Sequence, residues 1–137
     1  MTVTREQLEQ MFNDDLAGQF PWELHICLKI LDFISSEKKE NLNHITFRKL
    51  FELSNGPSMP TVTSAAQYLT GDRAQLLDIA FEFCSKSLIY PLTIDEVCTA
   101  RSAGEFKHPI TGELVDDWEH KILIYFILGV NGLEVAL

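Results

Sequence analysis

Residues 21–34 read PWELHICLKILDFI and carry two apolar stripes at the spacing of an α-helix. The first stripe comprises Leu24, Cys27, Leu28, Leu31 and Ile34, and the second comprises Trp22, Ile26, Ile30 and Phe33. Pro21 suits the first turn of such a helix, where an N–H group has no partner within the helix. A helix that is apolar around most of its circumference is buried, so we predict that this segment is the central helix of the core.

A first helix is predicted ahead of the central one, over residues 5–16. Thr4 and Gln7 have the spacing of a capping box, and apolar residues follow at helical intervals as far as Leu16. Gly18 is predicted to end this helix.

Short elements are predicted after the central helix. A strand is expected at residues 42–45, and Thr46 is expected to cap a helix that ends at the Asn55-Gly56-Pro57-Ser58 turn. The apolar patterns then predict helices over residues 61–69, 76–84 and 93–102, and a strand over residues 88–90. Residues 106–115 are typical of a β-hairpin that turns at Ile110 to Gly112.

The apolar run over residues 122–130 is compatible with two structures. Asp116 and Asp117 before it and Asn131-Gly132 after it favour a capped helix, whereas the isoleucine-rich run is typical of a buried strand. We favour the helix. The run can serve as core or as the surface of a homodimer, and both alternatives stay open.

Two stretches of the chain resemble winged helix-turn-helix domains. Residues 46–69 place Gly56 six positions before Val62, which is the usual separation between the turn glycine of a helix-turn-helix and a buried aliphatic residue of its second helix. Residues 83–90, FCSKSLIY, are similar to the end of a recognition helix that enters the first wing strand. The first stretch places the recognition helix at residues 61–69, and the second places it at residues 74–85.

The resemblance and the apolar patterns together imply a single, mostly helical α+β domain with a winged-helix-like core and one β-hairpin. Within residues 1–137 we expect an N-terminal helix (1–20), a helical core (21–92) that holds the helix-turn-helix candidate (46–69), and a C-terminal part (93–137) of helix, hairpin and apolar element. The predicted core residues are Phe12, Leu24, Cys27, Leu28, Leu31, Leu50, Leu69, Leu77, Ala80, Phe83, Ile89, Ile122 and Phe126.

Composition places the chain among ordinary globular proteins. Apolar residues make up 46% of it and charged residues 23%, which excludes a wholly disordered chain. The apolar run near the C-terminus is far shorter than the roughly 20 residues that span a bilayer, so no membrane association is expected. The polar N-terminus and the odd set of Cys27, Cys84 and Cys98 favour a cytoplasmic protein with free thiols.

Acidic residues outnumber basic ones, with 20 Asp and Glu against 11 Lys and Arg, for a formal charge of -9. Such surfaces steer association with basic partners. Two groups of acids are the candidate partner-binding surface: Glu6, Glu9, Asp14 and Asp15 near the N-terminus, and Glu113, Asp116, Asp117 and Glu119 near the C-terminus. We therefore predict a non-catalytic binding or inhibitor-type protein whose partner is a basic protein.

The alternative function is that of a helix-turn-helix regulator that binds DNA. We expect such a regulator to be a dimer, because paired half-sites raise affinity. In this alternative the candidate phosphate contacts are Arg48, Lys49 and Arg73, and the candidate base contacts are Thr61, Thr63, Ser64 and Gln67. Thr61 can also be a helix cap, and Ser64 and Gln67 can form a solvated helix face. The positive patch that DNA binding requires is scarcely present, because Glu52 and Asp72 in the same segment offset most of the positive charge.

Enzyme chemistry is not predicted, and no cofactor or metal is expected. The chain has no phosphate-binding glycine loop, no GxSxG motif and no CxxC pair. The best metal-ligating set is His108, Asp116 and His120, although His120 can simply pair with Asp116 across one helical turn. His25 and Cys27 are two positions apart on a helix and so point in different directions.

Overall fold

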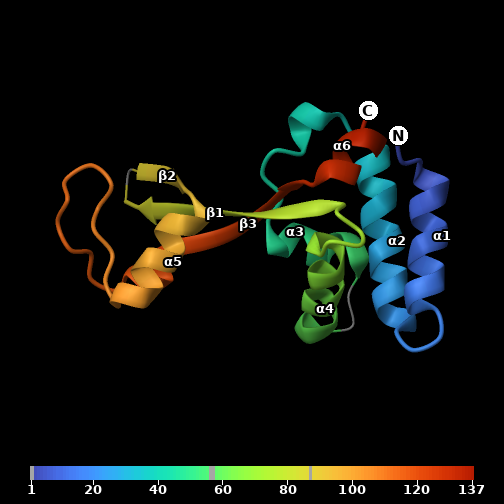
Figure 1. Cartoon of the computed structure of the whole chain (residues 1–137), viewed down its shortest axis with the longest axis horizontal. Coiled ribbons are helices and arrows are strands. Elements are labelled where there is room, and N and C mark those ends of the chain that lie inside the picture. The colour runs from blue at the N-terminus through green and yellow to red at the C-terminus, as the bar shows by residue number, and fades with distance from the viewer. Residues whose placement is uncertain (1, 56–57, 87) are drawn as a thin grey trace. The chain divides into compact units, whose positions relative to one another are not determined.

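The computed structural model describes residues 2–55, 58–86 and 88–137, which form helices and a small antiparallel sheet (Figure 1). The chain is α+β and mostly helical, as the sequence predicts. In order, the elements are α1 (Arg5–Leu16), α2 (Pro21–Ser35), η1 (Lys39–Asn41), α3 (Phe47–Ser54), α4 (Met59–Thr70), β1 (Leu77–Ser85), β2 (Leu88–Leu92), α5 (Ile94–Ala103), η2 (Trp118–His120), β3 (Ile122–Leu128) and α6 (Val130–Val135).

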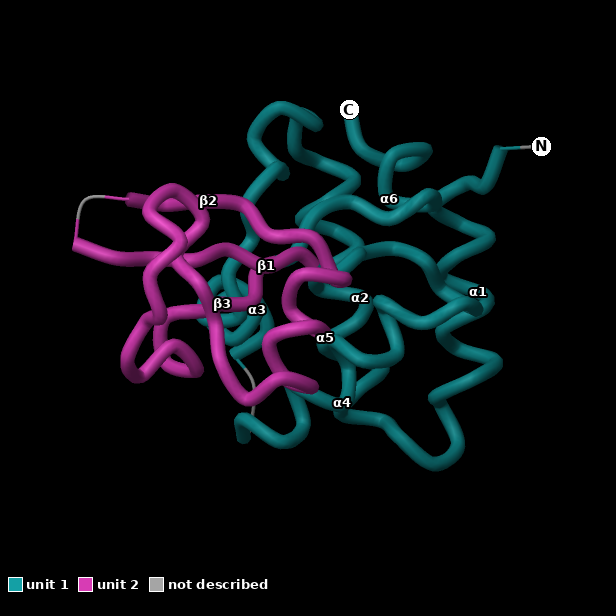
Figure 2. Tube along the Cα trace, turned by 60° about the vertical axis from the view of Figure 1, so that its left-hand side comes forward, with its two compact units in different colours: residues 1–79, 126–137 teal, residues 80–125 magenta. Residues whose placement is uncertain are grey.

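The fold divides into two compact units, which are coloured separately in Figure 2. Unit 1 comprises residues 1–79 and 126–137, and unit 2 comprises residues 80–125. Strands β1 and β3 each contribute residues to both units. Each unit has a hydrophobic core of its own.

Helix α2 is the centre of unit 1, which confirms the prediction made from its two apolar stripes. It packs against α1, α3, α4 and α6, and its buried residues are Ile26, Cys27, Ile30, Leu31 and Ile34. The second stripe is not buried along its whole length, because Trp22 is 58% exposed and stacks edge-on against His25. Leu24 and Leu28, both predicted core residues, are partly buried at the edge of this core.

The predicted first residues of α1 and α3 are confirmed, whereas α4 begins two residues earlier than predicted. The Thr4 hydroxyl accepts from the Gln7 N–H in a capping box, and the Thr46 hydroxyl accepts from the Lys49 N–H. Helix α4 begins at Met59 rather than at Thr61, because Ser58 is its N-cap. Helix α3 ends at Asn55 in a left-handed conformation, and the predicted turn residues Gly56 and Pro57 lie outside the described part of the chain.

The sheet has the order β2-β1-β3. Strands β1 and β2 are antiparallel, with Phe83 opposite Tyr90. Strands β1 and β3 are also antiparallel, because the Gly129 N–H donates to the Leu76 carbonyl at one end and the Cys84 N–H donates to the Lys121 carbonyl at the other. The strand predicted at residues 42–45 is reduced to a single antiparallel bridge between Ile45 and Phe126.

The helix predicted over residues 76–84, and the alternative recognition helix at residues 74–85, are wrong, since this segment is strand β1. Phe81 and Phe83 alternate with Glu82 along the strand, and Phe83 is buried in the core of unit 2. A run of apolar residues this short fits both the helical and the strand period, so periodicity alone does not separate them.

The helix favoured over the C-terminal apolar run is also wrong. Residues 122–128 form β3, and the short helix α6 follows it at Val130. Asp117 precedes the short 3-10 helix η2 in a left-handed conformation and its side chain caps nothing. Asn131 and Gly132, predicted to end a helix, lie within α6. The isoleucines and aromatics of β3 are the residue types that suit a pleated surface.

The core of unit 2 lies between the sheet and α5. Its buried residues are Phe83, Leu92, Val97, Ala100 and Phe106. The predicted helix after Thr93 is confirmed with its capping box, as is a strand at residues 88–90. The predicted hairpin is present as a single bridge between Lys107 and Leu114 with a turn at residues 109–111.

Besides Leu24 and Leu28, three further predicted core residues are less buried than expected. Ile89 is 70% exposed, because β2 lies at the edge of the sheet and its side chain points away from the core of unit 2. Ala80 and Ile122 are partly buried.

Candidate functional site

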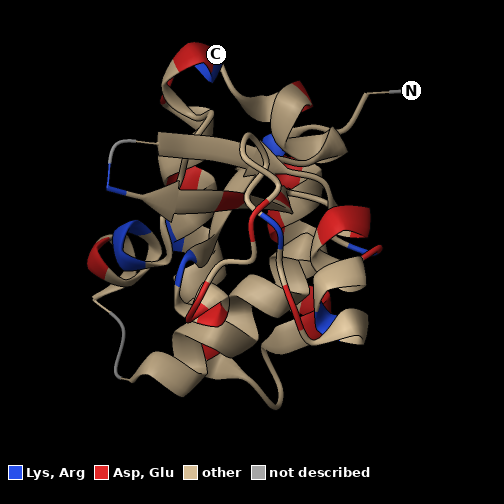
Figure 3. Cartoon of the chain, turned by 90° about the vertical axis from the view of Figure 1, so that its left-hand side faces the viewer, with Lys and Arg blue, Asp and Glu red and all other residues tan. Residues whose placement is uncertain are grey.

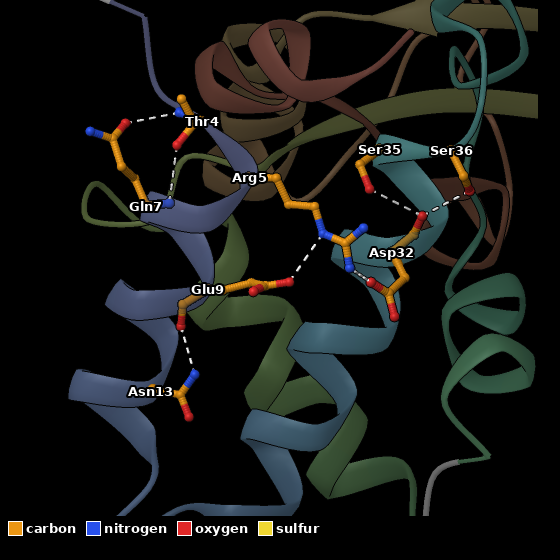
Figure 4. A network of polar contacts seen from close by, with 8 residues as sticks. All are labelled: Thr4, Arg5, Gln7, Glu9, Asn13, Asp32, Ser35 and Ser36. Atoms are coloured by element: carbon orange, nitrogen blue, oxygen red, sulfur yellow. Dashed lines mark hydrogen bonds and ion pairs between the residues drawn. The ribbon is translucent and has the colours of Figure 1, made fainter.

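Two of the four carboxylates of α1, those of Glu9 and Asp15, are paired with arginines. Figure 4 shows Arg5 between Glu9 and Asp32: its Nε lies 3.1 Å from the Glu9 carboxylate, and its guanidinium also donates to Asp32. Asp14 is exposed and accepts a hydrogen bond from the Gln10 side chain. Half of the predicted N-terminal acidic group is therefore engaged inside the chain.

Asp15 holds α1 against α4 and the turn that follows it. Its carboxylate accepts from the Arg73 Nε at 2.5 Å and from the Tyr68 hydroxyl at 2.5 Å. The hydrogen bonds from Arg73 and Tyr68 hold the pKa of Asp15 below its ordinary value, and burial together with the Asp15 carboxylate raises the pKa of Tyr68. Asp15, a candidate contact for a basic protein, and Arg73, a candidate contact for DNA phosphate, thus pair with each other.

The C-terminal acidic group is arranged differently. All four of its members are exposed, and within the described residues no Lys or Arg side chain lies in an ion pair with any of them: Glu113, Asp116, Asp117 and Glu119. The Lys121 ammonium donates to the backbone carbonyl of Asp116 and not to its carboxylate. Unit 2 as a whole carries eight Asp and Glu against four Lys and Arg, which Figure 3 marks along the ribbon.

His120 is the titratable partner within this acidic group. Its Nδ1 lies 2.6 Å from the Asp117 carboxylate. The hydrogen bond that the His120 ring donates to the Asp117 carboxylate, together with the charge of that carboxylate, raises the pKa of His120 above the ordinary value. The negative charge of this segment is consequently reduced when His120 takes up a proton.

The residues of the DNA hypothesis lie on α3, α4 and the following turn. Arg48 is paired with Glu52 at 3.3 Å on the surface of α3, and the Lys49 ammonium lies 5.4 Å from the ring centroid of Phe33. On α4 the Thr61 hydroxyl bonds the Ser58 hydroxyl, and the Thr63 hydroxyl donates to the Met59 carbonyl. Ser64 and Gln67 are exposed on the same helix.

The structure does not bring His108, Asp116 and His120 together as a metal site. The His108 ring accepts from the N–H groups of Ile110 and Thr111 and packs edge-on against Phe83, while His120 pairs with Asp117. Across the part of the chain that is described, no group of three or more His, Cys, Asp and Glu residues could hold a metal ion.

The three cysteines differ in environment. Cys27 is fully buried, as expected, and burial raises the pKa of its thiol to about 12. Cys84 is partly buried with a raised pKa, also mainly through burial, and Cys98 is exposed on α5. A raised pKa keeps Cys27 and Cys84 as thiols, which are poor nucleophiles.

An apolar cavity of about 150 Å³, which the sequence patterns did not predict, lies beside β3 in unit 2. It is lined by Phe81, Val97, Arg101, Trp118, Glu119, Ile122 and Ile124. With residues 122–128 assigned to a strand, Ile122 and Ile124 fall on one face, and that alternation is the signal that could have located the cavity.

Comparison with protein families, with curated proteins and with solved structures yields no significant match. Among the described helices none is long and apolar enough to cross a membrane.

Proposed function

We propose that this chain is a non-catalytic binding protein whose C-terminal acidic group engages a basic surface of another protein. The observation that carries the proposal is the contrast between the two acidic groups. In the N-terminal group Glu9 and Asp15 are neutralised by arginines, and Glu6 and Asp14 are exposed without such a partner. In the C-terminal group all four carboxylates of residues 113–119 are exposed with no Lys or Arg partner in the described structure.

Exposed carboxylates without a cationic partner repel one another, and a binding function explains why they are kept unpaired. Like charges close together repel, and their field accelerates encounter with an oppositely charged protein. Helix capping, the structural alternative for Asp116 and Asp117, is not supported, because the Asp117 side chain makes no capping bond to η2. A cytoplasmic location remains a prediction from the sequence, and so does a homodimer.

The proposal is tested by charge neutralisation with a matched control. The full-length chain is immobilised, retained proteins are identified, and association kinetics with the purified partner are measured. The variant Asp116→Asn with Glu119→Gln removes two carboxylates of the C-terminal group. The control, Glu6→Gln with Asp14→Asn, removes two exposed acids of α1 and leaves the Arg5 and Arg73 pairs intact.

We expect a partner with a basic isoelectric point, whose association slows about tenfold or more in the Asp116 and Glu119 variant at low salt and changes little in the control. Equal rates for the two variants would show that the C-terminal group is not the partner surface. A partner that is acidic or neutral would contradict the proposal as a whole.

A winged-helix DNA-binding regulator is the second candidate, and the order of elements in unit 1 favours it. Helices α2, α3 and α4 are followed directly by β1, and Ile45, between α2 and α3, pairs with β3. Because residues 77–85 form a strand, no extra helix separates α4 from the strands, and α4 takes the place of the recognition helix. The paired side chains of Arg48 and Arg73 weigh against it.

Fluorescence anisotropy with mixed-sequence duplex DNA, titrated from low to physiological salt, tests this candidate. A log–log salt slope of about -3 or steeper would indicate several phosphate contacts, and Arg48→Ala with Lys49→Ala would then abolish binding. In that case Asp116→Asn with Asp117→Asn should strengthen binding by removing repulsion. No binding at low salt would retire the candidate.

A further inference from the structure

The two outer strands of the sheet differ in how their free edges are protected. In an antiparallel pair, the residues that exchange hydrogen bonds alternate with residues whose N–H and C=O groups point away. The bonds Cys84 to Lys121 and Gly129 to Leu76 fix this alternation for β3. Odd-numbered residues of β3 face β1, and even-numbered residues face outward. The even-numbered Phe126 fits this alternation, because its N–H and C=O groups both bond Ile45 on the side away from β1.

On β2 the outward-facing positions are Ile89 and Pro91, since Tyr90 faces Phe83 of β1. Proline has no N–H group, so one outward donor of this edge is missing, a device that discourages pairing with another strand. On β3 the outward-facing positions within unit 2 are Ile122 and Ile124. No described residue pairs with the backbone groups of these two isoleucines.

The open edge of β3 adjoins the apolar cavity. Ile122 and Ile124 line it together with Phe81, Val97 and Trp118, and Ile124 is 50% exposed. In an added strand, the residue opposite an outward-facing isoleucine places its side chain on the same face of the sheet. That face holds the cavity, whose volume of about 150 Å³ matches that of a cavity able to bind benzene.

The charges around the edge indicate the occupant. Glu119 lines the cavity and belongs to the C-terminal acidic group, which precedes β3 in the chain. Arg101 is the cation in the lining, and unit 2 still has eight acids to four bases. Charge complementarity therefore favours a segment with Lys or Arg beside its apolar residues.

We propose that the edge of β3 at Ile122 and Ile124 binds an extended segment of a basic partner protein as an additional strand, with alternate apolar side chains entering the cavity. This inference rests on the proposed function and specifies its mode of binding. Backbone hydrogen bonds to Ile122 and Ile124 supply affinity, the cavity selects an apolar residue at alternate positions, and the carboxylates select positive charge.

The experiment uses the full-length chain and a fluorescently labelled, end-blocked peptide of alternating Lys and Val, followed by anisotropy. Ile124→Pro removes the outward N–H in the way that Pro91 does on β2, without removing a bond to β1. Ile124→Val is the matched control, because it keeps the N–H and the β-branched side chain. A second peptide, N-methylated at its valines, keeps the charges but lacks the donors that would face β3.

We expect saturable binding by the unmodified chain and by Ile124→Val, and binding weaker by about tenfold or more for Ile124→Pro and for the N-methylated peptide. Circular dichroism and thermal unfolding establish that Ile124→Pro is folded, and Ile122→Pro is the replacement if it is not. The N-methylated peptide needs no change in the protein. Equal binding of both peptides, or no binding by the unmodified chain, overturns the edge site.

The two proposals fail separately. If a basic partner is lost on neutralising Asp116 and Glu119 but Ile124→Pro binds the alternating peptide as well as Ile124→Val does, the edge site is wrong and the proposed function stands. If neutralisation leaves a basic partner's binding unchanged while the edge variants lose the peptide, the acidic surface is wrong and the edge site stands.

Discussion

Asp15 illustrates how one carboxylate can belong to the fold rather than to a binding surface. It accepts hydrogen bonds from Arg73 and Tyr68, which come from α4 and the turn after it. Its neighbour Asp14 is exposed and is bonded only within α1, to Gln10, in the described contacts. Both residues belong to the same acidic pattern in the sequence, and the difference between them arises from the face of α1 that packs against α4.

Asp15→Asn should lower the free energy of unfolding by about 1–2 kcal/mol at neutral pH, because a charged acceptor of two hydrogen bonds is lost. Since the pKa of Asp15 is lowered in the folded state, its contribution is complete above the ordinary carboxyl pKa and is lost as pH falls through the lowered value. Urea unfolding at several pH values measures this. Asp14→Asn is the control, and an effect as large there would contradict the assignment.

His120 should titrate above its ordinary pKa because of Asp117. A raised pKa means that the interaction stabilises the fold below the ordinary value and is lost as pH rises through the raised one. NMR titration of the imidazole should show a lower pKa in Asp117→Asn and little change in Asp116→Asn. An unchanged pKa in Asp117→Asn would show that the contact at 2.6 Å is not maintained in solution.

Helix α6 depends on a close approach to the segment that leads into β1. Gly132 is buried, and a Cβ atom there would overlap the Leu76 carbonyl oxygen. The Asn131 side chain donates to the Ala74 carbonyl at 2.8 Å, so α6 is also tied to that segment by a hydrogen bond. The sequence pattern predicts that Asn131-Gly132 ends a helix, whereas in the structure the lack of a side chain at Gly132 permits the close approach to Leu76.

Gly132→Ala should therefore lower the free energy of unfolding by about 1–3 kcal/mol, which is typical of overpacking a core. Thermal or urea unfolding measures the change. Gly18→Ala is a matched control, since a Cβ atom there meets nothing within 4 Å. Equal stability of the two variants would contradict the close packing of α6.

Helices were predicted better than strands, for a physical reason. The starts of α1, α3 and α5 depend on Thr4, Thr46 and Thr93, whose side chains bond the backbone three residues on. These signals are local and can be read from the chain. The pairing of β1 with β3 joins residues 37 to 53 positions apart, from Cys84 with Lys121 to Leu76 with Gly129, and the apolar residues of both strands fit either period.

The two units should differ in local stability. The buried cluster around Phe83, Leu92 and Phe106 in unit 2 is smaller than the cluster around α2 in unit 1. Local opening costs less where fewer apolar groups are buried. Native-state hydrogen exchange should show amides of α5, such as Val97 and Ala100, opening at a lower free energy than those of Ile30 and Leu31 in α2. A single common opening energy would show that the two units unfold as one.

The candidate site was predictable in part. The acidic residues at positions 113–119 were named from the sequence, because charge is a property of composition and needs no fold. The Arg5–Glu9 pair lies within α1, four residues apart, whereas the neutralisation of Asp15 by Arg73 depends on side chains that meet across elements. The open edge at Ile122 and Ile124 exists only in a strand, so the helix predicted for this segment gives no sign of it.

The sequence by itself determined the helical part of this protein, since α2 is apolar around most of its surface and Thr, Ser and Pro at the helix starts act on their immediate neighbours. Only the tertiary structure decided which apolar runs became strands, which carboxylates were paired across elements, and which strand edge lacked a partner. Those outcomes depend on contacts between residues far apart in the chain, and such contacts leave no periodic signal in either segment alone.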